Sequence, residues 1–323
     1  MSEIWQHNRW YSLGRPYVDW CTRQSFRALR YRGADLPTEG AVILAPNHTN
    51  TLMDALVMLA ARPDATVFGA RADIFRKPAV ARILHFLRIL PMVRQRDGLE
   101  HVSENYASFQ QIDDVLAHNV PFCLFAEGTH RPARTLQPIK KGIARIALHS
   151  ARSRQTWLVP TGINYSDFYH FRGVCEVRYG QAVDISAFVR EHAGLTEAQL
   201  LQELRCHIEE RMARMVEPEG PAAEKPHPLL LLVWPLAALL TLPIWLTAEV
   251  LCHKVKDKAW CNSIRCVCLV LLLLLPLTLL LWGLFFGLTL PWTWTLSLLT
   301  ATLFSYPVFY DGLRLFSKWS KHA

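Results

Sequence analysis

The sequence predicts an α/β domain with a mixed, largely parallel sheet flanked by helices, with interfacial helices before it and a membrane helical region after it. Short apolar runs alternate with helical patterns over residues 33–216, as strands and helices do in such domains. Aromatic residues and arginines interleave over residues 1–32, a pattern typical of a membrane interface. Residues 229–316 are leucine-rich with few acids, which indicates a different physical environment.

The N-terminal segment 1–32 combines aromatic rings with cations. Its rings are Trp5, Trp10, Tyr11, Tyr17, Trp20 and Phe26, and its arginines include Arg9, Arg15, Arg23, Arg27 and Arg30. Rings settle at headgroup depth and arginines pair with anionic lipid, so we expect interfacial amphipathic helices here. Gly14 and Pro16 are expected to break the segment into two helices. The alternative is an ordinary amphipathic helix that packs on the domain.

The domain over residues 33–216 shows the alternation most clearly. Residues 41–46, AVILAP, are apolar without interruption, as in a strand buried on both faces. Similar runs predict strands at 66–70, 90–94, 121–125, 158–163 and 175–179, with helices at 52–61, 78–87, 99–117 and 143–150. A charged helix over 195–216 closes the domain. The proline-rich stretch 217–228, EPEGPAAEKPHP, is the predicted linker.

Three apolar stretches after the linker predict a membrane region over residues 229–316. The first, 229–251, is interrupted by Pro235 and Pro243, so we expect it to dip into the bilayer and return, or to lie shallow. Residues 267–290 are long enough to cross about 30 Å of hydrocarbon. We predict that they form a crossing hairpin with residues 292–310. The positive-inside rule places the flanking basic clusters, and with them the α/β domain, on the cytoplasmic face of the membrane.

The composition of the chain restricts the classes of ligand and partner that we expect. The formal charge of +8 favours anionic lipid or a phosphorylated substrate, and no groove-reading motif accompanies it, so we expect no nucleic acid. The eight cysteines are scattered without the spacing of metal ligands, so we expect no metal site. Polar residues are spread through residues 1–20, which lack the unbroken apolar core of a signal peptide, and this agrees with a cytoplasmic domain.

The sharpest chemical pattern is PNHTNTLMD at residues 46–54, directly after the first strand. A histidine at this point lies at the carboxyl edge of a sheet, where ligand sites form. An imidazole titrates near neutrality, and a carboxylate on its other nitrogen fixes the tautomer, so His48 and Asp54 are a candidate general base and its partner. Residues six apart fall on different faces of a continuous helix. We therefore expect His48 on the loop and Asp54 in the first turns of the helix.

Polar residues follow other strands and are expected at the same edge. The segment FAEGTHR at 125–131 comes directly after the run PFCLF and contains Glu127 and Gly128. Lys140 precedes a helix whose free backbone N–H groups, together with the lysine, make a natural anion site. Arg94 ends the strand at 90–94, and Val159 with Pro160 lies in another strand.

In this order and spacing the patterns resemble the glycerolipid acyltransferase family, typified by 1-acyl-glycerol-3-phosphate acyltransferase and glycerol-3-phosphate acyltransferase. The resemblance covers about residues 25–215 and comprises four blocks. It implies that His48 and Asp54 are catalytic and that residues 69–94 form the second block, which ends in a phosphate-contacting arginine. The family's F-P-E-G-T block corresponds to residues 125–129, and its V-P block to residues 159–160. The acceptor and phosphate site implied in this way consists of Glu127, Gly128, Thr129, Arg94, Arg131 and Lys140.

Two departures from the family pattern stand out. Five residues separate His48 from Asp54, whereas the family usually has four; the longer spacing resembles a subset that includes some glycerol-3-phosphate acyltransferases. The segment FAEGTHR has His130 where the family has arginine, and Arg131 comes one place later. This puts phosphate binding by Arg131 in question, and Arg94 or Lys140 can share that role.

The resemblance implies transfer of a fatty acyl group from acyl-CoA or acyl carrier protein to 1-acyl-glycerol-3-phosphate in phospholipid biosynthesis, without a cofactor. His48 would remove the proton of the acceptor hydroxyl as that oxygen attacks the thioester carbonyl, with Asp54 orienting the ring. Glycerol 3-phosphate, a lysophospholipid or a lyso-aminolipid stays open as the acceptor. An alternative of another class is a non-catalytic membrane-binding protein with a degenerate acyltransferase domain.

Overall fold

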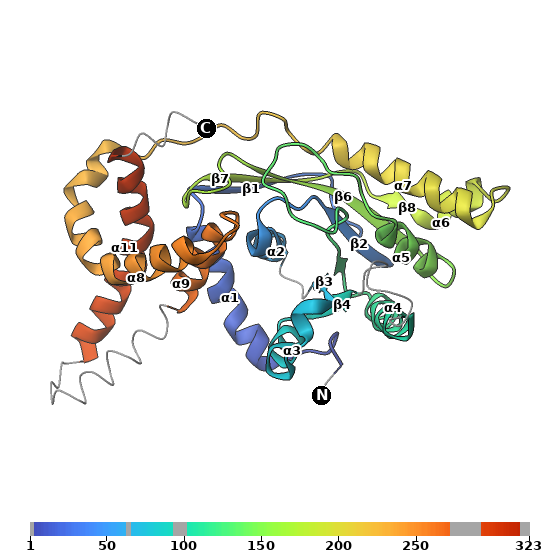
Figure 1. Cartoon of the computed structure of the whole chain (residues 1–323), viewed down its shortest axis with the longest axis horizontal. Coiled ribbons are helices and arrows are strands. Elements are labelled where there is room, and N and C mark those ends of the chain that lie inside the picture. The colour runs from blue at the N-terminus through green and yellow to red at the C-terminus, as the bar shows by residue number, and fades with distance from the viewer. Residues whose placement is uncertain (1–2, 63–65, 93–101, 272–291, 317–323) are drawn as a thin grey trace.

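The computed structural model describes residues 3–62, 66–92, 102–271 and 292–316. Within these ranges one sheet has the strand order β1-β7-β6-β2-β5-β3-β4, with β8 beside β6 (Figure 1). The strands are β1 Ala28–Gly33, β2 Ala41–Pro46, β3 Val67–Arg71, β4 Ile89–Met92, β5 Phe122–Cys123, β6 Thr156–Tyr165, β7 Val174–Tyr179 and β8 Val183–Asp184.

The sheet is mixed and largely parallel, so the predicted fold class is confirmed for the α/β domain. β7 and β8 each run antiparallel to β6, and the other paired strands are parallel. β2 pairs with β6 on one side and β5 on the other, and all six of its residues are buried. This explains the uninterrupted apolar run AVILAP, because both faces of a central strand meet protein.

Helices cover both faces of the sheet and form two cores. On one face Ile43 of β2 packs with residues of α4 Val102–Ala117, α5 Lys141–Ala151, α6 Ile185–Glu191 and α7 Glu197–Ala213. On the other face Leu44 packs with residues of α1 Arg9–Gln24, α2 Thr51–Ala60, α9 Trp260–Leu271 and α11 Trp292–Phe316. Neighbouring strand residues point to opposite faces, which is why one strand feeds both cores. At the β4 edge lie η1 Ala72–Phe75 and α3 Pro78–Phe86 (Figure 1).

The N-terminal helix is continuous. α1 runs from Arg9 to Gln24 and includes Pro16, so the predicted break into two helices is wrong. A proline removes one backbone donor, and the surrounding helix here tolerates that loss. The Asn8 side chain accepts hydrogen bonds from the N–H groups of Trp10 and Tyr11 and caps the first turn.

The predicted interfacial helices extend to residue 32, and this boundary is wrong because residues 28–33 form a strand. This strand, β1, pairs in parallel with β7 over its whole length. Leu29 and Tyr31 point toward the core on one face of the sheet, whereas Arg30 and Arg32 point to the opposite face and are more exposed. The arginines obscured the strand pattern, because edge strands can carry charge that central strands exclude.

The C-terminal part begins after residues 217–227, which form neither helix nor strand, and contains η4 Pro228–Leu232 and α8 Trp234–Lys254 ahead of α9. α8 bends by 61° between Trp234–Leu242 and Ile244–Lys254, where a proline stands, as its sequence led us to expect. This bent pair has the length and composition to enter a bilayer, but no single helix among the described residues is long and apolar enough to cross one. The predicted crossing at 267–290 lies mostly outside the described residues. The crossing at 292–310, which falls in α11, has no support.

The far end of α11 packs onto the α/β domain. Tyr306 and Tyr310 are buried, and their rings lie 5.7 Å and 4.9 Å from the ring of Phe171. Asp311 is buried too, and its carboxylate lies 2.9 Å from the Arg172 guanidinium. The last turns of α11 are therefore held by protein contacts.

Candidate active site

His48 and Asp54 meet at the carboxyl end of β2. The strand ends at Pro46 and α2 begins at Thr51, so His48 lies on the connecting loop and Asp54 in the first turn of the helix, as predicted. The Nδ1 atom of His48 is 2.7 Å from the Oδ2 atom of Asp54. The Asp54 side chain is fully buried, and that of His48 is 18% exposed. The loop thus presents an accessible imidazole whose inner nitrogen contacts a buried carboxylate.

The Asp54 carboxylate is itself fixed by several donors. Its Oδ2 atom accepts hydrogen bonds from the backbone N–H groups of Thr49 and Asn50, each at 2.7 Å. The Tyr165 hydroxyl donates to the other oxygen at 2.7 Å. An ionised carboxylate only accepts hydrogen bonds, so the Nδ1 atom of His48 carries the proton in the neutral ring, and its Nε2 atom is free to accept one.

The segment after β5 lies beside the His48 loop. The Phe125 ring stacks on the His48 ring with centroids 4.2 Å apart, and the His130 ring meets it edge-on at 5.6 Å. The backbone N–H of Arg131 donates to the carbonyl of His48 at 3.0 Å. The two loops therefore share one edge of the sheet, as their positions after β2 and β5 predict.

Glu127 is a buried carboxyl group in this segment. It is 2% exposed, and its Oε2 atom accepts a hydrogen bond from the Gln137 side chain at 2.7 Å. Its Oε1 atom is buried and has no hydrogen-bond partner among the described residues. Burial raises the pKa of Glu127 to about 7, and the hydrogen bonds from Gln137 oppose that rise. A buried acceptor without a partner is costly, so this oxygen is suited to receive a substrate donor.

Gly128, Thr129 and Lys140 lie around Glu127. Gly128 has a φ of +68°, and a Cβ there would come within 3.3 Å of the Lys140 side chain, so glycine relieves both strain and crowding. The Lys140 N–H donates to the carbonyl of Ala126 at 2.8 Å, which holds the start of α5 against this loop. The ammonium group of Lys140 belongs to an exposed side chain. Thr129 is exposed, and its carbonyl accepts from Gln137 at 3.2 Å.

The two arginines of the predicted site fare differently. The Arg131 backbone contacts the His48 loop, but its guanidinium is exposed and donates to the Thr135 hydroxyl at 3.1 Å. Arg94 lies outside the described residues. Pro160 stands opposite Ala45 in the ladder between β6 and β2, so the V-P pair lies beside the strand that carries His48.

Several residues at the site were not foreseen. The His130 Nε2 atom is 2.6 Å from the Asp257 Oδ2 atom, and this hydrogen bond lowers the pKa of Asp257. Tyr165, which contacts Asp54, comes from the end of β6. Asp257 and Tyr165 are more than a hundred positions away from their partners. No local sequence pattern reveals contacts at such separation.

The arrangement of possible metal ligands and thiols can be described for the ranges given above. No three His, Cys, Asp or Glu side chains there converge as metal ligands would. The cysteines are free thiols, and burial raises the pKa of Cys123, which lies in β5 beside the site. A thiol in such surroundings is a poor nucleophile because the thiolate is the reactive form.

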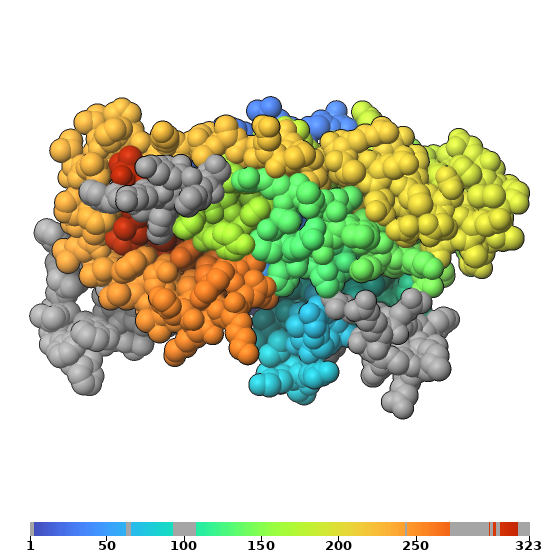
Figure 2. Space-filling view, turned by 45° about the horizontal axis from the view of Figure 1, so that its top comes forward, coloured from blue at the N-terminus to red at the C-terminus, as the bar shows by residue number. Residues whose placement is uncertain are grey.

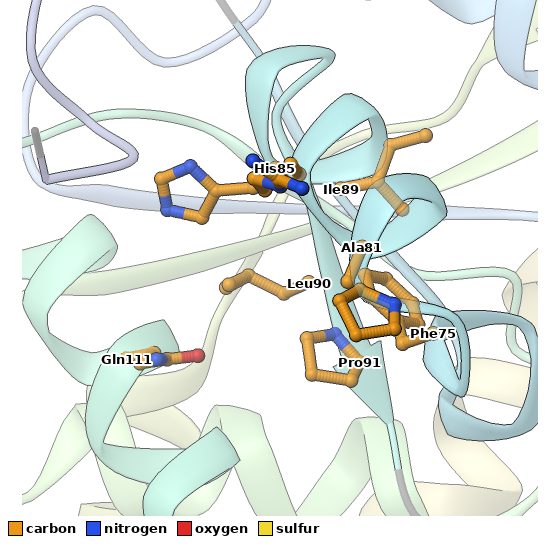
Figure 3. Close-up of a pocket in the computed structure, with 9 residues that line it drawn as sticks. Phe75, Ala81, His85, Ile89, Leu90, Pro91 and Gln111 are labelled. Carbon is orange, nitrogen blue, oxygen red and sulfur yellow. The ribbon is translucent and has the colours of Figure 1, made fainter. Parts of the chain in front are cut away.

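A separate apolar cavity of about 420 Å³ lies at the β4 edge of the sheet. Figure 3 shows Phe75, Ala81, His85, Leu90 and Pro91 around it, from η1, α3 and β4. None of the predicted site residues that the structure describes lines this cavity.

Part of the chain is similar to known proteins. A family model described as Acyltransferase matches residues 28–164, which include His48, Asp54 and Glu127. No curated protein matches the chain. Among solved structures, the 1-acyl-sn-glycerophosphate (LPA) acyltransferase PlsC from Thermotoga maritima is similar, with 19% identity and a TM-score of 0.46 over 62% of this chain and 78% of that chain.

Proposed function

We propose that the chain is an acyltransferase of the glycerolipid acyltransferase family, and that it transfers a fatty acyl group from acyl-CoA or acyl carrier protein to 1-acyl-glycerol-3-phosphate at a membrane. The match of residues 28–164 to the Acyltransferase family model supports this proposal. The product is a phospholipid precursor. The observation that carries this proposal is the 2.7 Å contact between His48 Nδ1 and the buried Asp54 carboxylate, with a partly exposed ring beside Glu127.

The reaction follows from the state of the His48 ring. Its free Nε2 atom accepts the proton of the acceptor hydroxyl as that oxygen bonds to the thioester carbonyl carbon. The carbon–sulfur bond then breaks, and the departing thiolate takes the proton back from the imidazolium. The Asp54 carboxylate holds the ring in the required tautomer and stabilises its charged form. Among the described residues no serine or cysteine hydrogen-bonds to His48, so direct transfer is favoured over a covalent acyl-enzyme.

The acceptor headgroup has suitable partners near the base. The unpartnered Oε1 atom of Glu127 can accept a hydrogen bond from an acceptor hydroxyl. Lys140 is an exposed cation beside Gly128, and Arg131 is a second one. Together they supply positive charge for a phosphate, and Arg94 has the same role in the family resemblance. His130 stands at the place of the family's arginine, and its ring is hydrogen-bonded to Asp257. Because the family's arginine is replaced here, glycerol 3-phosphate and lysolipids without a terminal phosphate stay open as acceptors.

An apolar and basic surface supports membrane association. α3 has no buried residue and exposes Val80, Ile83 and Phe86, and Leu87 directly after it is exposed too. The nearby cations are Arg76, Lys77 and Arg82. α1 exposes Trp10 and Leu13 at 76% and 73%. The Tyr11 ring of α1 lies 6.3 Å from the Phe86 ring, so the two helices are neighbours. Exposed apolar side chains with cations nearby suit binding to the surface of an anionic bilayer. We propose that the domain binds the cytoplasmic face of the membrane through this surface.

The test is an acyl-transfer assay on the purified full-length chain. Palmitoyl-CoA and palmitoyl-acyl carrier protein are each offered with 1-acyl-glycerol-3-phosphate, glycerol 3-phosphate, a lysophospholipid or a lyso-aminolipid. We expect transfer to 1-acyl-glycerol-3-phosphate and a loss of about 100- to 10,000-fold in His48→Ala. His118→Ala is the matched control, because this exposed imidazole lies beside Asp114 and stacks on Trp5, away from the site.

Each outcome separates the candidates. Preference for another acceptor in the panel assigns that acceptor in place of 1-acyl-glycerol-3-phosphate. Folded wild-type protein that transfers no acyl group with any donor and acceptor, yet binds vesicles, identifies a membrane-binding protein with a degenerate domain. Equal activity of His48→Ala and wild type would exclude His48 as the base.

A further inference from the structure

A segment from the C-terminal part of the chain, residues 257–263, lies against both loops of the site. The Ser263 hydroxyl oxygen is 2.8 Å from that of Thr51, and both side chains are buried. At the other end of the segment, the Asp257 carboxylate binds the His130 ring at 2.6 Å. Figure 2 shows the orange surface of this part of the chain beside the green surface of the segment after β5.

Thr51 has an unusual backbone conformation. Its φ is +46°, in the left-handed region, which a β-branched residue adopts only at a cost in free energy. Thr51 stands between His48 and Asp54, where the loop becomes α2. The reversal at this point brings the backbone N–H groups of the loop and the His48 ring onto one oxygen of Asp54. The strained residue therefore shapes the contact on which the base depends.

The partners of the Thr51 side chain come from the C-terminal segment. Its hydroxyl lies 3.4 Å from the Ala259 carbonyl oxygen in addition to the Ser263 hydroxyl. A hydroxyl can donate one hydrogen bond and accept another, so both contacts form together. Strained conformations persist where surrounding structure holds them, and here that structure is α9 and the turn before it.

We propose that residues 257–263 position the catalytic pair: Ser263 and Ala259 hold Thr51 in its left-handed conformation, and this sets Asp54 against His48. The C-terminal part of the chain is then needed for turnover and not for attachment alone. The longer spacing of five residues between His48 and Asp54 is accommodated by this tether. The proposal rests on the acyltransferase role of His48.

The test compares two substitutions at one position. Thr51→Val keeps the branched shape and removes the hydroxyl, so the strained loop loses its tether, and we expect kcat to fall about tenfold with little change in KM. Thr51→Gly also removes the hydroxyl, but glycine adopts a positive φ without strain. We expect it to keep kcat within about threefold of wild type. A packing role alone predicts the reverse order, because valine fills the buried volume and glycine leaves it empty.

Ser263→Ala probes the same tether from its other end. We expect it to lower kcat like Thr51→Val, and the double variant Thr51→Val with Ser263→Ala to be no slower than either one, because both remove one interaction. Ser305→Ala is the control: its hydroxyl also makes a buried 2.9 Å contact with a threonine, Thr241, but between α8 and α11. It is expected to leave kcat unchanged.

The assay uses the full chain with whichever acceptor the wild type acylates, and melting temperatures verify that each variant is folded. The proposal is supported if the wild type is active and Thr51→Gly has a higher kcat than Thr51→Val. The proposal is overturned if the wild type is active and the kcat of Thr51→Val equals or exceeds that of Thr51→Gly. The proposed function is not affected by that result. A wild type inactive with every donor and acceptor overturns the proposed function itself, and this inference with it.

Discussion

The burial of Glu127 predicts how the free energy of unfolding depends on pH. Its pKa is raised from 4.5 to about 7 because the carboxyl group is buried. The folded chain thus binds this proton more tightly than the unfolded chain does. The resulting stabilisation is fully present below pH 4.5, is lost as the pH rises toward 7, and does not change further above that. A shift of this size corresponds to about 3 kcal/mol, and the side chain is buried enough for solvent screening to be small.

Glu127→Gln removes the titration and keeps the shape. Between pH 4.5 and pH 8 the wild type is expected to lose about 3 kcal/mol of unfolding free energy relative to the variant, because only the wild type loses the proton at position 127. Urea unfolding of both proteins in the same detergent, followed by tryptophan fluorescence at pH 4.5, 6 and 8, measures that difference. Glu203→Gln, on the exposed face of α7, is the control for loss of one formal charge. A difference for Glu127→Gln that stays constant across this range would refute the reasoning.

Three further predictions address other contacts. Asp54→Asn loses an acceptor that the His48 ring requires, so kcat should fall by roughly 10²–10⁴-fold in the acyl-transfer assay while the protein stays folded. Asp311→Ala removes the buried carboxylate that pairs with the half-buried guanidinium groups of Arg172 and Arg27, and it should cost about 3–5 kcal/mol in urea unfolding; no loss would exclude a structural role. Ile83→Glu, on a helix with no buried residue, should weaken binding to anionic vesicles by at least about tenfold in cosedimentation, with activity in detergent unchanged.

Local patterns predicted the parts of the fold that depend on local physics. A central strand buried on both faces must be apolar throughout, so AVILAP could be assigned to β2 from sequence alone. The strand–loop–helix order around His48 also followed, because residues six apart cannot share one face of a helix. The two loops after β2 and β5 could be expected at one edge, since parallel strands end at the same side of a sheet.

Contacts between distant segments could not be predicted in this way. β1 is rich in arginine and became a strand because β7 offers it a parallel partner over its whole length. α1 stayed in one piece although Pro16 removes a backbone donor. Tyr165 reaches Asp54, and Asp257 reaches His130, through folding of the whole chain. Such pairs leave no periodicity or spacing in a single sequence.

The charged contacts of the C-terminal helices bear on how the site is held together. Arg265 of α9 is buried, lies 2.9 Å from Glu249 of α8, and also donates to the carbonyl of Tyr169 at 2.8 Å in the α/β domain. The buried Asp311 carboxylate pairs with Arg172 and so ties α11 to the same domain. Separating a buried charge from its partner costs free energy, so these contacts resist displacement of the helices from the sheet. Movement of α9 away from the domain would break the Arg265 contacts and carry Ser263 away from Thr51. If the bent α8 enters a bilayer, the proposed tether between Ser263 and Thr51 requires that α9 stays in place.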